Sequence, residues 1–329
     1  MPNVAIVGAT GAVGQEFLKI LTERKFPVDE LRLLATQRSA GKKVLWQGRE
    51  LTVAETTHDS FKGIDMALFA GGSSSTEYAR SAVASGAVVI DNSSAFRLDP
   101  EVPLVVPEVN PEDVKWHQGI IANPNCSTII MVVALKPIFD LAGIRRVVVS
   151  TYQAVSGAGR EGIEELETQV RAWGQGETLV SQVFPYQIAF NLIPRIDVFQ
   201  EGNYTKEEWK MVKETQKIFH IPEMRITATT VRVPVLRSHS ESINIETERK
   251  VSLEDVRKVL GQAPGVIVID HVAQDRYPMP LYSADTDEVY VGRIREDFTV
   301  ESGLNLWVVG DQIRKGAATN AVQIAELLL

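Results

Sequence analysis

A glycine-rich turn near the N-terminus constrains the fold of this chain more than any other feature. The sequence GATGAVG at 8–14 follows the short apolar run 4–7 and opens the amphipathic stretch 12–23. Glycines at a strand-to-helix turn allow close backbone approach, and the unpaired N–H groups of the helix N-terminus can then bind a pyrophosphate. The GxxGxxG spacing differs from the commoner GxGxxG. Its place between strand and helix nevertheless predicts a dinucleotide site rather than a packing turn, built on Gly8, Gly11 and Gly14.

The second predicted strand, 31–35, indicates which dinucleotide is bound. An NAD site usually carries an acidic residue about 20 positions after the glycine turn, where it binds the ribose 2′-hydroxyl. Here the strand is followed by Thr36, Gln37, Arg38 and Ser39, without an acid. Arg38 offers a fork of donors and Ser39 a hydroxyl for a 2′-phosphate. NADP is therefore favoured, although Arg38 alone also fits a solvated loop.

Short apolar strands alternate with helices through the first part of the chain. Further strands are expected at 66–69, 88–90 and 120–122, with a helix at 75–85 and a small β excursion at 38–57. This alternation predicts an α/β domain of Rossmann type, with a doubly wound parallel sheet. At 329 residues the chain is long enough for a second domain.

After residue 126 the strands are longer and the helices fewer. Strands are expected at 145–153, 226–233, 242–247, 266–269, 289–293 and 304–309. Helices are expected at 161–173, 204–219 and 253–262, and a last one at 317–329. The pattern predicts an α+β domain with a mixed, largely antiparallel sheet.

Composition argues against several classes of protein. With 34 basic and 42 acidic residues the net charge is −8, which does not suit a nucleic-acid-binding protein. No apolar run reaches the roughly 18 residues of a membrane span, and the N-terminus has no signal-peptide pattern. A single cysteine excludes an intrachain disulfide and suits the reducing cytoplasm. No His/Cys cluster has the spacing of metal ligands.

The only cysteine, Cys126, lies in NPNCST at 123–128, directly before the apolar-periodic run 129–141. We expect it at or near a helix N-terminus, where the helix dipole favours a thiolate. A lone cysteine is more often a buried small hydrophobe, but this position indicates a nucleophile. His239, flanked by Ser238 and Ser240, is the best candidate base. The other four histidines lie in less suitable stretches, at His58, His117, His220 and His271.

The chain resembles the aspartate-semialdehyde dehydrogenase family essentially from end to end. The resemblance rests on GATGAVG at 8–14, VPEVN at 106–110, NPNCST at 123–128, STYQAVSGAG at 150–159, AFNLIP at 189–194, EEWKM at 207–211, RVPVLRSHS at 232–240 and VGDQIRKGAA at 309–318. These motifs occur in order, and no motif position departs from the family pattern. Its length is similar to that of the shorter form of the family.

The resemblance implies a role for each matching residue. Cys126 would be the nucleophile that forms an acyl thioester, His239 the acid/base, and Gln153 would orient the substrate beside the reacting carbon. The positions that match cofactor contacts are Thr10, Gly11, Ala12, Val13, Arg38, Ser39, Ser156, Gly157 and Gln312.

The same resemblance implies the substrate contacts. Arg232 would bind the α-carboxylate of the substrate and Glu207 its ammonium group, while Arg97 and Lys210 would bind phosphate. From the residues alone other interpretations stay open. Glu207 and Lys210, three apart on a predicted helix, also fit an exposed ion pair. Arg97 also fits a loop salt bridge, and Gln153 an amide at a strand edge.

The family implies a domain organisation and an activity. Residues 1–125, completed by a C-terminal segment 309–329, would bind NADP, and residues 126–308 would form the catalytic and dimerisation domain of a homodimer. The activity would interconvert L-4-aspartyl phosphate and L-aspartate 4-semialdehyde, on the route to lysine, methionine and threonine. The partners would be the small-molecule substrate and inorganic phosphate.

Three alternatives remain at this stage. N-acetyl-γ-glutamyl-phosphate reductase shares the fold and the Cys/His chemistry, but an acid at Glu207 suits only a substrate with a free amine. Glyceraldehyde-3-phosphate dehydrogenase is disfavoured because the acid typical of NAD sites is missing after the second strand. A noncatalytic NADP-binding redox regulator would use Cys126 as a sensor thiol, and would have no need of His239 and Arg232 beside it.

Overall fold

The computed structural model describes residues 1–329, and the chain forms two compact units. The first unit comprises Met1–Asn125 and Ala317–Leu329, and the second comprises Cys126–Gly316. The sequence predicted that the chain returns to the first unit at residue 309. That position was wrong because residues 303–310 form a strand in the sheet of the second unit. None of the helices combines the length and apolar character that a membrane span requires.

The first unit is built on a six-stranded parallel sheet with the order β5-β2-β1-β6-β7-β8. Its strands are β1 Val4–Val7, β2 Leu31–Ala35, β5 Ala54–Glu55, β6 Met66–Phe69, β7 Val88–Asp91 and β8 Ile120–Ala122. Its helices are α1 Ala12–Glu23, α2 Ser74–Ala84 and α8 Thr319–Glu326. The predicted β excursion is the hairpin of β3 Lys43–Trp46 and β4 Arg49–Thr52, followed by β5. The predicted Rossmann-type parallel sheet is therefore confirmed.

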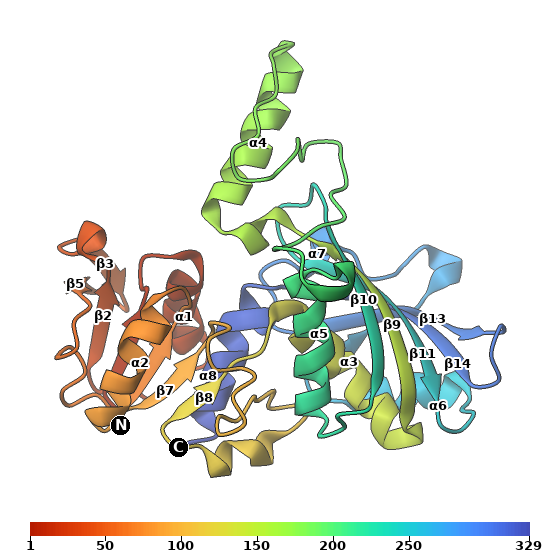
Figure 1. Cartoon of the computed structure of the whole chain (residues 1–329), viewed down its shortest axis with the longest axis horizontal. Coiled ribbons are helices and arrows are strands. Elements are labelled where there is room, and N and C mark those ends of the chain that lie inside the picture. Colours follow the sequence, from red (N-terminus) through yellow and green to blue (C-terminus); the bar gives the residue numbers. More distant parts are fainter. The chain divides into compact units, whose positions relative to one another are not determined.

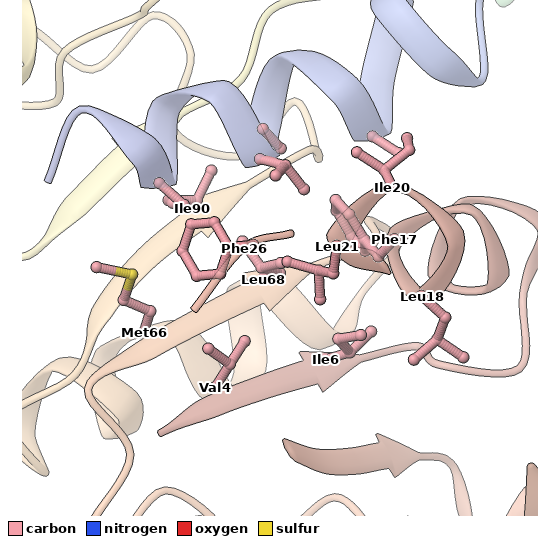
Figure 2. Packing of buried hydrophobic residues seen from close by; sticks show 14 of the residues in the cluster. Val4, Ile6, Phe17, Leu18, Ile20, Leu21, Phe26, Met66, Leu68 and Ile90 are labelled. Atoms are coloured by element: carbon pink, nitrogen blue, oxygen red, sulfur yellow. The ribbon is translucent and has the colours of Figure 1, made fainter. Parts of the chain in front are cut away.

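One apolar cluster joins the two stretches of chain that form this unit. The inward side chains of β1 and β6 contact Phe17, Ile20 and Leu21 of α1, and the cluster includes Ala321 and Val322 of α8. Figure 2 shows α8 lying along this cluster. Because burying an apolar side chain contributes about 1.5–3 kcal/mol, α8 is an integral part of the core of the first unit.

The second unit is built on a six-stranded mixed sheet with the order β10-β9-β11-β14-β13-β12. Its strands are β9 Ile144–Gln153, β10 Arg225–Arg232, β11 His239–Thr247, β12 Val266–Val268, β13 Val289–Asp297 and β14 Gly303–Gly310. The pairs β9/β10 and β12/β13 are parallel, and the other three pairs are antiparallel. The predicted mixed sheet is confirmed.

Helices pack against one face of this second sheet. They are α3 Cys126–Ala142, α5 Lys206–Ile218 and α6 Leu253–Gln262, whereas α7 Pro280–Ser283 is a single turn. The helix α4, Arg160–Gln175, rises away from the sheet of its own unit (Figure 1). The side chains of Glu165 and Gln169 on α4 accept backbone hydrogen bonds from residues 182–184 and 188–189 and so hold the following loop against the helix.

Three element boundaries differ from the prediction. The strand expected to start at Ser242 begins at His239, because the alternation in β11 was hidden by buried polar residues such as Glu241. The helix expected from Tyr204 begins at Lys206, because Thr205 and Glu208 form a reciprocal capping box. The last helix begins at Thr319 rather than 317, after a π-helical turn at 314–318.

The glycine turn offers a direct test of the first unit. A Cβ atom on Gly14 would lie 2.3 Å from the Gly8 carbonyl oxygen, so α1 packs against this turn only without a side chain there. We expect Gly14→Ala to lower the free energy of unfolding by about 1–3 kcal/mol, measured by urea titration. Gly11→Ala is the matched control, because its Cβ would lie 3.4 Å from the same oxygen. Equal losses in the two variants would contradict this packing.

Candidate active site

Cys126 is the first residue of α3, as the sequence predicted, and its side chain is partly exposed. Most of the helix behind it is buried and apolar, which fixes its position against the sheet. Gly316 makes room for the cysteine, because a Cβ atom at 316 would lie 2.9 Å from the Cys126 Cβ atom. The nucleophile candidate therefore stands at a helix N-terminus, where the helix dipole favours negative charge.

The strand register of the second unit aligns the other candidates in one row across the sheet. Arg232 on β10 lies opposite Gln153 on β9, and His239 on β11 lies opposite Gly310 on β14. The β9/β11 register, in which Ser240 pairs with Tyr152, continues to set His239 opposite Gln153. Side chains at paired positions point to the same face of a sheet. Gly310 continues the row toward Val289 of β13, and its missing side chain admits Ile130 of α3 to the sheet.

Cys126 and His239, distant in sequence, meet beside this row. The Cys126 Sγ atom lies 3.5 Å from Nε2 of the His239 imidazole. The backbone N–H of Ala154 donates a hydrogen bond of 3.0 Å to Nδ1 of the same ring. Since Nδ1 accepts this hydrogen bond, the proton of the neutral ring is assigned to Nε2. The imidazole therefore presents an N–H donor to the sulfur atom.

The surroundings of His239 keep its ring uncharged. Burial and the positive charge of Arg232 lower the pKa of His239 to about 3, and the opposing charge of Glu207 does not offset them. His239 is the only fully buried histidine of the five. At neutral pH the site thus combines a nucleophile with a hydrogen-bond donor rather than with an imidazolium.

The predicted substrate contacts form a connected network beside this pair. The Gln153 amide donates to a Glu207 carboxylate oxygen at 3.1 Å, and Lys210 Nζ donates to the other at 3.0 Å. Lys210 also donates to Asp197 at 3.1 Å. Burial disfavours the charge of Lys210, but the attraction of Glu207 and Asp197 outweighs it and raises the Lys210 pKa. The expected ion pair on α5 exists, but it is largely buried rather than exposed.

Arg232 is a second cation in the same neighbourhood. Its Nη1 donates to the Ala154 carbonyl oxygen at 2.6 Å, and its guanidinium lies over the Phe184 ring at 5.8 Å. Burial lowers the Arg232 pKa, opposed by the charges of Glu207 and Cys126. Gly157 lies close by, where a Cβ atom would be 2.7 Å from Arg232 Nη1. The guanidinium is thus held at the site by the backbone, with its charge available for an anion.

Two further predicted cofactor contacts lie next to His239. The Gln312 side chain accepts a hydrogen bond from the backbone N–H of Ser238 at 2.9 Å and donates to Ser156 Oγ. Ser156 in turn donates to the Leu236 carbonyl oxygen. Ser156, Gly157 and Gln312 are therefore gathered beside His239 within the second unit.

The remaining predicted residues belong to the first unit. Gly8 and Ala9 donate to the Leu34 carbonyl at the end of β2, which brings the glycine turn beside the next loop. Thr10 Oγ1 lies 3.3 Å from Ser39 Oγ, and Arg38 is exposed. The N-terminus of α1 begins at the exposed residues Gly11 and Ala12 without a side-chain cap, and it fits the pyrophosphate of a dinucleotide.

Arg97 also belongs to the first unit. It is buried, and its guanidinium donates to the Asn123 carbonyl at 2.9 Å and to the Asn92 carbonyl at 2.8 Å. These contacts hold the Arg97 guanidinium against the backbone of Asn92 and of Asn123, and Asn123 belongs to the same NPNCST motif as Cys126. Its partnership with Lys210 on a phosphate stays a prediction.

Sequence reasoning missed a buried polar layer beside the row of Arg232, Gln153 and His239. Thr230, Thr151 and Glu241 form the next row of the same face, and all three are fully buried. Thr151 Oγ1 donates to Gln153 Oε1 at 3.0 Å and so orients its amide. Neither carboxyl oxygen of Glu241 has a hydrogen-bond partner, and burial raises its pKa well above the usual value. Only the period-two spacing from His239 could have signalled Glu241.

Comparison with known proteins agrees with this arrangement. Residues 3–117 match the family model of the semialdehyde dehydrogenase NAD binding domain, and residues 135–315 match that of the semialdehyde dehydrogenase dimerisation domain. The aspartate-semialdehyde dehydrogenase of Aquifex aeolicus is 63% identical over 332 residues, covering 99% of this chain and 98% of that protein. The chain belongs to the aspartate-semialdehyde dehydrogenase family.

Solved structures of this family share the fold. The aspartate semialdehyde dehydrogenase II of Vibrio cholerae, described in complex with ASA, superposes with a TM-score of 0.97 at 50% identity, covering 100% of this chain and 98% of that one. The enzyme of Candida albicans, described with NADP, gives a TM-score of 0.75 at 28% identity over 100% and 98% of the two chains. A nicotinamide dinucleotide is therefore the cofactor of this family member.

The lowered pKa of His239 predicts an unusual pH profile for Cys126. A ring with a folded-state pKa of about 3 stays neutral from pH 5 to pH 9, so its charge does not change over that range. The rate of Cys126 alkylation by iodoacetamide, followed by mass spectrometry, should show no inflection near pH 6.5. An inflection there that disappears in His239→Asn would contradict a neutral ring.

Glu241 predicts a separate effect on stability. Its pKa is raised in the folded state, so above the unfolded pKa the native protein holds a proton that the unfolded chain releases. The contribution of Glu241 to the free energy of unfolding therefore falls as pH rises, by about 1.4 kcal/mol per pH unit, until the folded-state pKa is reached. Glu241→Gln should raise the unfolding free energy more at pH 8 than at pH 5 in denaturant titrations. A gain that is equal at both values would contradict a protonated Glu241.

Proposed function

We propose that this chain catalyses the NADP-dependent, phosphorylating oxidation of L-aspartate 4-semialdehyde to L-4-aspartyl phosphate and the reverse reaction, through a thioester on Cys126. The observation that carries the proposal is the contact between Cys126 and the Nε2–H of a neutral His239, with Gln153, Glu207 and Arg232 beside it. When bound, the dinucleotide accepts hydride from the substrate or returns it.

The tautomer of His239 suits this chemistry without any proton transfer to the ring. When the Cys126 thiolate adds to the aldehyde carbon, the carbonyl oxygen becomes an alkoxide directly. The Nε2–H of His239 can donate a hydrogen bond to this alkoxide, an effect of about 3–4 kcal/mol in comparable sites. Loss of hydride from the same carbon leaves the thioester. Phosphate oxygen then attacks the thioester carbonyl, and the thiolate leaves. Of the two roles predicted for His239, acid and base, the geometry supports the acid role.

The polar network selects an amino acid as substrate. Arg232 supplies a fixed fork of donors for the α-carboxylate, and the buried Glu207 supplies a negative charge for the ammonium group. An acetylated amine would remove the substrate cation that faces Glu207 and so take one cationic partner from a carboxylate that also pairs with Lys210, which disfavours the N-acetylglutamyl alternative. Lys210, held on Glu207 and Asp197, is proposed to bind phosphate together with Arg97.

NADP rather than NAD is proposed as the cofactor from the end of β2. No acid follows the strand, Ser39 lies against Thr10, and the exposed Arg38 offers its guanidinium to a 2′-phosphate. The relative from Candida albicans described with NADP is consistent with this choice. A homodimer formed through the second unit is proposed from its match to the dimerisation domain. A thiol nucleophile favours the reducing cytoplasm as its location.

The test is NADP reduction by the purified protein, followed at 340 nm, with L-aspartate 4-semialdehyde and inorganic phosphate. We expect turnover that requires phosphate and is abolished in Cys126→Ala. With NAD in place of NADP, the ratio kcat/KM should fall by a factor on the order of 10², because a 2′-phosphate contact is charge-assisted.

The matched competitor is N-acetyl-L-glutamate 5-semialdehyde under the same conditions. Glu207→Gln should lower the ratio of the kcat/KM values for L-aspartate 4-semialdehyde and the acetylated aldehyde, because the carboxylate that favours the free ammonium is then removed. Preference of the wild type for the acetylated aldehyde would overturn the proposed substrate. NADP binding without turnover of either aldehyde would favour a redox regulator.

A further inference from the structure

His239 is preceded by a residue in an unfavourable backbone conformation. Ser238 has φ of 73°, in the left-handed region that non-glycine residues rarely adopt, and it is fully buried. Its hydroxyl makes no hydrogen bond, so the conformation is not stabilised by its own side chain. Such residues cost about 1–3 kcal/mol and persist only where the surroundings hold them. The question is which contacts hold Ser238, and with it the start of β11.

The segment that follows β14 supplies these contacts. Arg237, on one side of Ser238, donates to the Asp311 carboxylate at 2.6 Å. The N–H of Ser238 itself donates to Gln312 at 2.9 Å. The next pair along, His239 and Gly310, closes the β11/β14 ladder. Three consecutive residues before and at the catalytic histidine are thus attached to three consecutive residues of one neighbouring segment.

Asp311 is the centre of this attachment. Its side chain is fully buried, and its two oxygens accept four hydrogen bonds. One oxygen receives the N–H groups of Ile313 and Arg314, which folds the turn around Gln312. The other receives the N–H of Asp285 at 2.7 Å and the Arg237 guanidinium. A buried carboxylate with four donors is well compensated, and it links the Gln312 turn rigidly to Arg237.

We infer that Asp311 is a positioning residue of the active site, which holds Ser238 in its left-handed conformation through Arg237 and Gln312 and so fixes His239 against Cys126. If these contacts are lost, Ser238 relaxes to negative φ and the start of β11 shifts. The His239 ring then leaves the Ala154 N–H that sets its tautomer. Asp311 touches neither substrate nor sulfur in this account, and it acts only through the position of His239.

The decisive measurement is the rate of Cys126 alkylation by iodoacetamide in Asp311→Asn. Asparagine keeps one acceptor oxygen for the turn but places an NH₂ group where Arg237 needs an acceptor. The Cys126 thiolate loses the Nε2–H donor that stabilises it, so a smaller fraction of the thiol is ionised at low pH. We therefore expect the alkylation rate at low pH to fall by about tenfold from wild type. The pH profile should shift, and kcat should fall by about 100-fold with KM changed much less.

The strain on Ser238 provides a rescue experiment. Glycine adopts positive φ without cost, so Ser238→Gly should no longer depend on the contacts from Asp311. In the double variant Asp311→Asn/Ser238→Gly, we expect the alkylation profile to return toward wild type and kcat to recover by about tenfold. A merely structural role for Asp311 predicts no such recovery, because glycine lowers stability in other respects.

Asp270→Asn is the matched control. Asp270 is a nearly buried carboxylate of the same unit that pairs with Arg257 at 2.8 Å, away from the catalytic row. It should lose comparable thermal stability but keep the wild-type alkylation profile. If Asp311→Asn does not fold, Arg237→Gln breaks the same ion pair from the exposed side and should give the same shift.

The inference rests on the proposed function only for the kcat measurement, because alkylation needs no substrate. An altered alkylation profile without aldehyde turnover would support Asp311 as the positioning residue while refuting the proposed function. An unchanged profile in Asp311→Asn, or an equal change in Asp270→Asn, would overturn the inference. Failure of Ser238→Gly to restore the profile would also overturn it.

Discussion

The hydrogen bond from the Ala154 N–H to Nδ1 of His239 is the interaction on which the rest of the site depends. It sets the proton on Nε2, and Nε2 faces the Cys126 sulfur at 3.5 Å. Burial and Arg232 then keep the ring uncharged. A histidine in this state serves as a donor to a thiolate or an alkoxide. Addition of a thiolate to an aldehyde and loss of hydride require such a donor, and they require no base.

The strand register of the mixed sheet places His239 where this hydrogen bond can form. Arg232, Gln153, His239 and Gly310 occupy neighbouring positions on four strands, so one row brings the guanidinium, the amide and the imidazole together near Cys126. The polar layer beside this row includes Glu241, whose buried carboxyl lacks partners and lowers stability above its unfolded pKa. Functional sites commonly retain such unfavourable groups. The strained Ser238 is a second example in the same neighbourhood.

Much of this organisation could be predicted from the sequence. Apolar runs and glycine turns are local signals, so β1, α1 and β2 were predicted with the bounds that the structure has. Cys126 was expected at a helix start for the same reason. The tautomer of His239 and the contacts of Asp311 could not be predicted, because they depend on contacts between residues about 70–85 positions apart. The start of β11 was missed because its inward face carries His239 and Glu241 instead of apolar residues.

The proposed reaction requires that a thioester forms on Cys126 before phosphate enters. The most direct test is intact-mass spectrometry after rapid mixing of the protein with L-aspartate 4-semialdehyde and NADP, without phosphate. The account predicts one aspartyl group per chain, located on Cys126 by peptide mapping, absent in Cys126→Ala and released when phosphate is added. A wild-type protein that reduces NADP in phosphate but never carries this group would contradict the account.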